Sequence, residues 1–282
     1  MTYKRKKLIK KLIMHFCLII FTAVMLYPLI WMASSSLKES SQVFVDAHHL
    51  IPEAWNFSNY ADGWAGFGGI TFATFFKNSF IITTLATIGS VVFSAVVAYG
   101  FSRINFRGKK FWFIVMMLTM MLPFEMVMIP QYIMFSWFQW IDTYLPLIAP
   151  SFFGVPFFIF LMMQFIRTIP RELDQAARID GCNTISIFFR IIVPLIVPAM
   201  MTATIFSFYW RWDDFMAPLI YLQTPEKYPL SLALKLFSDP NSVTNWGGLF
   251  AMTTLSLLPI VVIFFIFQRY IVDGISTSGL KG

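Results

Sequence analysis

The chain has 282 residues, of which 58% are hydrophobic and only 12% are charged, whereas soluble domains carry about 25% charged residues. These proportions exclude an ordinary soluble domain and indicate a helical protein embedded in a membrane. The net charge of +7 would also fit a nucleic-acid-binding protein, so the positions of the charges have to decide. Two cysteines, Cys17 in an apolar stretch and Cys182 in a polar connection, supply neither a disulfide framework nor a metal-ligand cluster.

Apolar stretches long enough to cross a hydrocarbon core of about 30 Å as a helix occur six times. They predict an all-α polytopic protein, with residues 1–282 as one transmembrane domain and spans at 12–34, 78–102, 111–133, 145–165, 191–222 and 246–267. The first stretch is longer than the apolar core of a signal peptide, about 7–15 residues, so it should remain as a helix. The fifth is too long for one straight crossing.

The lysines and arginines predict the orientation, because they concentrate on the cytoplasmic side of membrane proteins. With the N-terminus inside, 16 of the 21 fall in the inner segments, at residues 4–11, 103–110, 167–190 and 269–281. Both termini are therefore predicted to be cytoplasmic. Since the basic residues are divided among short loops rather than gathered on one face, a nucleic-acid partner is not expected.

The first outer segment, residues 39–77, is rich in glycine, asparagine and proline with interspersed Trp55, Tyr60 and Trp64. This composition is typical of a turn-rich loop at the membrane interface. The loop either contacts an outside partner or only anchors the chain, and composition leaves both open. His48 and His49 are adjacent and point in divergent directions, so no metal site is predicted.

The second and third stretches carry packing signals. In the second, small residues recur every four positions, at Ala86, Ser90, Ser94 and Ala98, which predicts close approach of a neighbouring helix. The third is rich in methionine around Pro123 and Pro130, prolines that should kink or break the helix. Core filling is the simpler interpretation of the methionines, and a moving gate is the alternative.

The inner connection between the fourth and fifth stretches, residues 166–190, predicts a short helix from Glu172 to Asp180 that Gly181 ends. Asn183 or Thr184 can cap a second helix. Positions i, i+3, i+4 and i+7 form a small, nearly flat face, at Leu173, Ala176, Ala177 and Asp180. Such a face suits docking against a groove of a cytoplasmic partner.

Charged residues inside the predicted spans are informative, because each costs about 2.5–3.5 kcal/mol at a helix centre. Four occur, at Glu125, Arg211, Asp213 and Asp214. Arg211 and Asp214 are three residues apart and can pair, and Tyr209, Trp210 and Trp212 add aromatic groups with polar edges. This set fits the pathway of a polyhydroxylated solute. It equally fits the outer, interfacial end of a long span.

No catalytic spacing is present in the sequence. Gly274, Gly279 and Lys281 resemble a phosphate-binding loop, but Leu280 stands where the loop needs lysine. The chain is therefore predicted to have no ATP site of this kind, no catalytic residue and no bound metal or cofactor.

The inner connection resembles a known signature. The run from Ile169 to Gly181, with Phe189, Pro194 and Pro198 after it, is similar to the E-A-A-x-x-x-G motif of binding-protein-dependent ABC importer permeases. Residues 268–274 and 279–282, with Trp212-Asp213-Asp214-Phe215 and Pro218-Leu219-Ile220, resemble the carbohydrate branch, specifically its maltose-type second permease subunit. The resemblance covers essentially the whole chain.

The resemblance implies that residues 169–190 form the coupling segment, whose helix sits in a cleft of an ATPase subunit. The expected coupling residues are Glu172, Asp174, Gln175, Ala176, Ala177, Asp180 and Gly181. The family's glutamate is replaced by Gln175, so a neutral hydrogen bond has to serve there, or Glu172 or Asp174 compensates.

The resemblance also implies the assembly and the location. The expected partners are a second permease subunit, two ATPase subunits or domains that bind ATP and Mg, an extracytoplasmic solute-binding protein, the carbohydrate and membrane lipid. The expected location is the bacterial cytoplasmic membrane.

The function expected from these features is that of a non-catalytic permease subunit that imports a di- or oligosaccharide, with a uronate-containing one as the more specific hypothesis. Its expected pathway residues are Glu125 and residues 209–214. One alternative is a secondary transporter driven by an ion gradient, with Glu125 after Pro123 as its carboxylate. A membrane-embedded enzyme using Glu125, Asp213 and Asp214 is the other.

Overall fold

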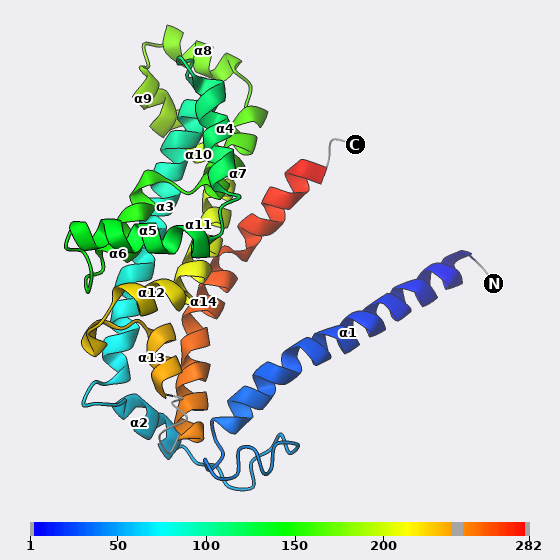
Figure 1. Cartoon of the computed structure of the whole chain (residues 1–282). Helices are drawn as coiled ribbons and strands as arrows, with labels where there is room; N and C mark the ends of the chain where they lie inside the picture. Colours follow the sequence, from blue (N-terminus) through cyan, green and yellow to red (C-terminus); the bar gives the residue numbers. More distant parts are fainter. Residues whose placement is uncertain (1–2, 238–244, 280–282) are drawn as a thin grey trace. The chain divides into compact units, whose positions relative to one another are not determined.

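The computed structural model describes residues 3–237 and 245–279, so Lys281 of the predicted inner charges lies outside the described residues. In this part the regular elements are all helices, and an isolated bridge joins Phe67 and Ile70 (Figure 1). The all-α prediction is confirmed for the described residues. Two compact units are distinguished and are treated separately below: residues 1–72 with 234–257, and residues 73–233 with 258–282.

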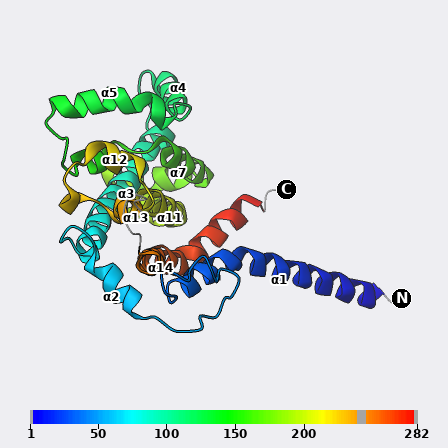
Figure 2. The ribbon, with the colours of Figure 1, turned by 60° about the horizontal axis from the view of Figure 1, so that its bottom comes forward.

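The first unit contains α1 (Tyr3–Ser35), α2 (Ser58–Ala65), the end of α13 (Leu230–Phe237) and the first part of α14 (Trp246–Gly279). Figure 2 shows α1 as one long helix followed by the loop that leads to α2. The side chains of α1 are exposed over most of its described length. Lipid can cover such a surface, since the apolar side chains of a membrane helix do not have to be buried against protein.

Buried Lys38 organises the loop between α1 and α2. Its ammonium donates to the carbonyl oxygens of Asp46 and His49, both at 2.6 Å, and lies 4.0 Å from Asp46 Oδ2. Asn59 Nδ2 donates to the carbonyl of Lys38 at 2.7 Å. A buried ammonium needs such acceptors, because it has left water. Lys38 therefore holds together the loop between α1 and α2.

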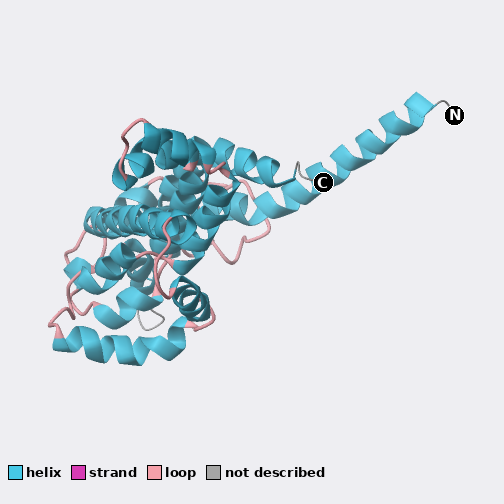
Figure 3. Cartoon of the chain, turned by 90° about the horizontal axis from the view of Figure 1, so that it is seen from above, coloured by secondary structure: helices cyan, strands magenta, loops and turns pink. Residues whose placement is uncertain are grey.

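The second unit contains the first residues of α13, the later part of α14 and the remaining helices. Figure 3, coloured by secondary structure, shows helices joined by loops. In chain order the remaining helices are α3 (Phe72–Arg103), α4 (Lys109–Thr119), α5 (Phe124–Trp137), α6 (Leu145–Ile148), η1 (Ala149–Phe153), α7 (Pro156–Thr168), α8 (Glu172–Ile179), α9 (Thr184–Ile187), the π-helical turn η2 (Phe188–Ile192), α10 (Val193–Leu195), α11 (Val197–Trp212), α12 (Met216–Tyr221) and η3 (Pro225–Lys227). The main core joins α3, α7, the α9–α10 segment and α11.

Close packing around α3 explains its pattern of small residues. The predicted stripe is buried throughout, at Ala86, Ser90, Ser94 and Ala98. Ser94 Oγ accepts a hydrogen bond from the backbone N–H of Val155 at 2.9 Å. The preceding Gly154 has φ of 84°, which a residue with a side chain rarely adopts. The prediction that a neighbouring segment approaches α3 closely is confirmed.

Four continuous segments are long and apolar enough to cross a membrane: Lys7–Ser35, Phe72–Arg103, Leu145–Thr168 and Trp246–Arg269. Two further pairs of helices pass the same test together but are bent, by 103° between α4 and α5 and by 74° between α10 and α11. The described residues thus hold four candidate spans, or up to six if each bent pair is one span. The protein is a multi-pass membrane protein.

In the two bent pairs, the helices differ from the single helices predicted at 111–133 and 191–222. The helix of the third span stops at Thr119 and resumes at Phe124, directly after Pro123. Proline lacks the N–H that continues a helix and disfavours helical geometry in the residue before it, whereas Pro130 is accommodated inside α5. The fifth begins earlier, at Thr184, bends at Ile196 and ends at Trp212.

Candidate functional site

The connection between α7 and α9 folds as the predicted short helix. Glu172 and Asp174 lie in the first turn of α8, where carboxylates interact favourably with the helix dipole. The helix ends before Gly181, which adopts the left-handed φ of 83°. Asn183 Oδ1 accepts a hydrogen bond from the N–H of Ser186 at 2.8 Å and so caps α9. The predicted helix and its end signals are confirmed.

The residues of the predicted small face of α8 differ in burial. Ala177 is buried and belongs to the main core, which also contains residues of α7 and η2. Asp174 is half-buried, and the other expected coupling residues are exposed, at Glu172, Gln175, Ala176, Asp180 and Gly181. Leu173 is 44% exposed. Ala177 therefore seats α8 on its own chain, while the outer residues of α8 stay available to a partner.

A buried ion pair fixes α8 to the end of α3. Arg103 Nε lies 2.9 Å from Asp174 Oδ2, and the two side chains are only 6% and 14% exposed. Arg103 Nη2 also donates to the carbonyl of Ile169 at 2.7 Å. The sequence places Arg103 only among the inner basic residues, and no local pattern signals its partner.

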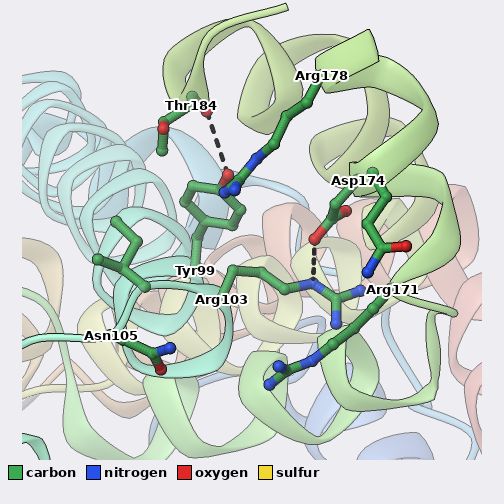
Figure 4. A pocket seen from close by; sticks show the side chains of 9 residues that line it. Tyr99, Arg103, Asn105, Arg171, Asp174, Arg178 and Thr184 are labelled. Carbon is green, nitrogen blue, oxygen red and sulfur yellow. Dashed lines mark hydrogen bonds and ion pairs between the residues drawn. The ribbon is translucent and has the colours of Figure 1, made fainter.

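A cavity of about 390 Å³ opens beside this ion pair (Figure 4). Figure 4 shows the side chains of Arg103 and Asp174 pointing toward each other, with Arg171 and Arg178 on either side. The Tyr99 hydroxyl donates to the carbonyl of Thr184 at 3.2 Å, which links α3 to the start of α9. Three arginines against one carboxylate leave this cavity positively charged.

The predicted pair in the fifth span forms, with Arg211 Nη1 3.9 Å from Asp214 Oδ2. Arg211 Nη2 donates to Ser151 Oγ at 3.1 Å, and Asp214 Oδ1 accepts from the N–H of Ala217 at 3.2 Å. Ser231 Oγ donates to the carbonyl of Asp214 at 2.6 Å. Both charged side chains are therefore tied to other helices of the second unit.

The space beside Arg211 and Asp214 is small. The cavity that they line with Ser79, Thr83 and neighbouring apolar side chains has a volume of about 10 Å³. A water molecule needs about 10–15 Å³ by this kind of measure. In this conformation the cavity has no room for a sugar.

The aromatic neighbours of this pair differ in burial. Trp212 is buried and stacks on Phe208, with ring centroids 5.5 Å apart. Tyr209 and Trp210 are both 46% exposed, although Trp210 stacks on Phe158. Tyr209 and Trp210 are thus partly exposed, whereas Trp212 packs inside the protein.

Two other predicted pathway residues are exposed, Asp213 at the end of α11 and Glu125 in the first turn of α5. Within the described part of the chain, no hydrogen bond or ion pair joins Glu125 to Arg211 or to either aspartate. The structure brings Arg211 and Asp214 together and leaves Glu125 outside that group.

Asp142 connects the loop after α5 with the loop after α12, two segments that the sequence does not relate. Its carboxylate accepts hydrogen bonds from the N–H groups of Gln223 and Thr224, both at 2.9 Å, and from Lys227 Nζ at 2.7 Å. Burial alone would raise the pKa of Asp142, but the hydrogen bonds from Lys227, Thr224 and Gln223 outweigh it and hold the pKa well below its usual range. We refer to this arrangement as the Asp142 clasp.

Asp46, His48 and His49 lie within 4.8 Å of one another by their ligand atoms. The two histidines are exposed, and the Lys38 ammonium already interacts with the Asp46 carboxylate. A neighbouring cation opposes the binding of a metal ion. The expectation that the chain holds no metal stays a prediction.

Comparison with known proteins identifies relatives along most of the chain. The family model for the binding-protein-dependent transport system inner membrane component matches residues 90–277. The probable ABC transporter permease protein YurM of Bacillus subtilis strain 168 is 34% identical over 266 residues, which cover 94% of this chain and 87% of the relative. The arabinooligosaccharides transport system permease protein AraQ of the same organism is 32% identical over 259 residues, or 91% of each chain.

The fold also has a solved counterpart. A crystal structure of a bacterial ABC transporter involved in the import of the acidic polysaccharide alginate matches with a TM-score of 0.82 and 24% identity. The match covers 96% of this chain and 99% of that chain. At this identity the likeness shows the fold alone.

Proposed function

This chain belongs to the family of binding-protein-dependent transport system inner membrane components, in its carbohydrate ABC importer branch, and from that premise we propose that it moves a di- or oligosaccharide into the cytoplasm. Members of this family are membrane components without catalytic activity of their own. The energy would come from ATP and Mg bound by separate ATPase subunits.

The proposed assembly pairs this chain with a second permease subunit, two ATPase subunits or domains and an extracytoplasmic solute-binding protein. It would sit in the cytoplasmic membrane of a bacterium, with both termini inside. Family membership and the inner basic residues support this arrangement.

The observation that carries the proposal is the way α8 is mounted. The outer residues of α8 are exposed, while Ala177 and the Arg103–Asp174 pair attach the helix to the core and to α3. A displacement of α8 by an ATPase would therefore be passed to a membrane-spanning helix. Because Asp174 is already paired, the negative charge available near Gln175 belongs to the exposed Glu172 and Asp180.

Replacing Ala176 with tryptophan tests this docking. Ala176 is exposed, so the bulky side chain leaves the fold intact but blocks close contact with an ATPase, and we expect ATP-dependent uptake to fall at least about tenfold. Ala177 and Gly181 are poorer targets, since Ala177 is buried and Gly181 has a positive φ. Uptake in vesicles and the amount of inserted protein are measured together.

Ala23→Trp is the matched control, because Ala23 is an exposed alanine of α1, remote in sequence from α8. It should retain normal uptake. Normal uptake by Ala176→Trp would contradict the docking proposal. Uptake that survives ATP depletion but collapses with the proton gradient would support the secondary-transporter alternative.

The substrate hypothesis concerns Arg211, which we propose contacts a uronate carboxylate during transport, with Tyr209 and Trp210 offering ring faces to the sugar. The exposure of these two aromatic side chains supports it. Since the cavity at Arg211 is close to the size of one water molecule, the sugar contact requires another conformation of the transport cycle.

Uptake of matched neutral and uronic oligosaccharides by Arg211→Gln tests the hypothesis. Loss of a charged hydrogen bond should reduce uptake of the acidic sugar by at least about tenfold and spare the neutral one. Arg211→Lys keeps the charge and should recover part of the acidic uptake. Equal impairment for both sugars would reject the role in charge recognition.

A further inference from the structure

A basic rim with an apolar floor surrounds a cavity of about 340 Å³ in the second unit. The cavity is separate from the one beside Asp174 and is lined by Lys109, Lys110 and Arg167 together with Phe101, Phe113 and Met163. Phe101 and Phe113 pack edge to face with ring centroids 6.1 Å apart, and Met163 is buried beneath. We refer to it as the inner-rim cavity.

The positive charge of the inner-rim cavity is not neutralised within the described residues. There, no carboxylate lies within ion-pairing distance of Lys109, Lys110 or Arg167, and Lys109 donates only to the carbonyl of Ile104, at 2.9 Å. Repulsion from Arg171 and Arg167 acts on Lys109. Such a gathering of like charges costs free energy unless an anion occupies it.

An adjoining cavity of about 490 Å³ shares Lys109 and Arg167 and is also lined by Arg171 and Glu172. Glu172 is exposed and forms no ion pair with a described residue. One exposed carboxylate does not offset these basic groups.

The position of the inner-rim cavity limits what can fill it. Its residues come from the end of α3, the first turns of α4 and the end of α7, so they lie at the ends of candidate spans on the side predicted to be cytoplasmic. A soluble anion would interact only with the basic side chains of the rim and would not use the apolar floor. The rim and the aromatic floor together match a molecule with an anionic head and an apolar tail.

We propose that the inner-rim cavity binds the phosphate headgroup of an anionic phospholipid from the inner leaflet. Lys110 and Arg167 contact the phosphate oxygens, Lys109 adds a third positive charge, and the first methylene groups of the lipid lie on Phe101 and Phe113. Basic pockets between membrane helices on the cytoplasmic side are suited to this chemistry. The proposal is independent of the transported sugar.

Native mass spectrometry of the full-length chain in detergent tests the proposal. Phosphatidylglycerol and zwitterionic phosphatidylcholine with identical acyl chains are titrated separately, and glycerol phosphate and inorganic phosphate are added as soluble competitors. Phosphatidylglycerol should bind at least about 30-fold more tightly than phosphatidylcholine. The soluble anions should displace it only weakly, because they cannot use the apolar floor.

The double variant Lys110→Gln and Arg167→Gln should lose about 30-fold in affinity for phosphatidylglycerol, at about 1 kcal/mol for each charge. Both side chains are exposed and form no hydrogen bond or ion pair with a described residue, so the fold does not depend on them. Arg107→Gln with Arg190→Gln removes the same charge from exposed positions outside the cavity. This control should keep the affinity of the unchanged chain.

Three results would overturn the proposal. Equal binding of the two lipids would exclude recognition of the anionic head. Equal losses in the two double variants would show a diffuse charge effect rather than a site. Displacement of the lipid by inorganic phosphate at matching concentration would assign the cavity to a free anion.

Discussion

Asp142 illustrates how a single carboxylate can join segments that are distant in the chain. Its side chain is 24% exposed, and its hydrogen-bond donors all come from residues 223–227. The N–H of Asp142 in turn donates to the carbonyl of Tyr221 at 2.8 Å. The clasp therefore holds the loop after α12 against the loop after α5.

The clasp predicts a definite pH dependence. The pKa of Asp142 is lower in the folded chain than in the unfolded chain, where it is about 3.9. The carboxylate therefore contributes fully to stability above the unfolded pKa, and this contribution is lost as the pH falls through the folded pKa. At neutral pH, Asp142→Asn should cost about 2 kcal/mol of local stability, a figure reduced because Lys227 is 42% exposed. Amide hydrogen exchange at residues 222–228 measures it.

Glu226→Gln serves as the control for Asp142→Asn, since Glu226 is an exposed carboxylate in the same loop. In the Glu226→Gln variant, the protection of residues 222–228 from amide hydrogen exchange should remain that of the unchanged chain. A clasp contribution that vanished already between pH 7 and 5 would contradict the lowered pKa.

Residue-scale features were predictable where the governing interaction is local. The end of α8 at Gly181 agrees with the prediction, and Asn183 is the cap of α9 among the two predicted candidates, Asn183 and Thr184. Both signals depend on only a few neighbouring residues. Arg103 and Asp142 carried no such signal. Each looks like an ordinary loop or boundary charge until its partner is brought beside it.

At the scale of elements, α8 depends on two anchors of different kinds. Ala177 supplies an apolar contact and the Arg103–Asp174 pair a charged one. Removing one member of a buried ion pair leaves an uncompensated charge and costs about 3–5 kcal/mol, whereas replacing both with apolar residues costs much less.

The single variant Asp174→Asn should therefore release α8 from α3 more than the double variant Arg103→Met with Asp174→Leu does. We expect faster hydrogen exchange across residues 172–179 in the single variant, and partial recovery of protection in the double one. Equal exchange in the single variant and the unchanged chain would show that Ala177 alone holds α8.

The prolines show where element boundaries can be inferred from sequence. Pro123 ends one helix and begins another at a bend of 103°, as its missing N–H predicts. Pro130 stays inside α5 and Pro259 inside α14. The rule identifies where a helix is weakened, and the surrounding packing decides whether it breaks.

At the scale of the whole molecule, the charge distribution predicts the orientation of the spans, and this prediction is open to a direct test. In a chain without Cys17 and Cys182, we expect a membrane-impermeant maleimide to label Ser58→Cys in intact cells. Thr168→Cys should react only after permeabilisation, because residue 168 belongs to the basic segment that is predicted to be cytoplasmic. Both positions are exposed, so burial cannot account for a difference.

The reverse pattern of labelling would overturn the predicted orientation. Labelling of both positions in intact cells would show that the bent pair α4–α5, which lies between residues 58 and 168, does not cross as a single span. The experiment therefore also tests whether α4 and α5 together form one of the candidate spans.

The amino-acid sequence was sufficient to predict the membrane class, the helical fold, the signals at the ends of α8 and the resemblance to carbohydrate importer permeases. These depend on apolar length, local capping and contiguous motifs, which are read along the chain. Only the tertiary structure decided the burial of Ala177, the Arg103–Asp174 pair, the Asp142 clasp and the near absence of space beside Arg211. These depend on which distant segments pack together, and a side chain's local sequence holds little information about the free energy of such contacts.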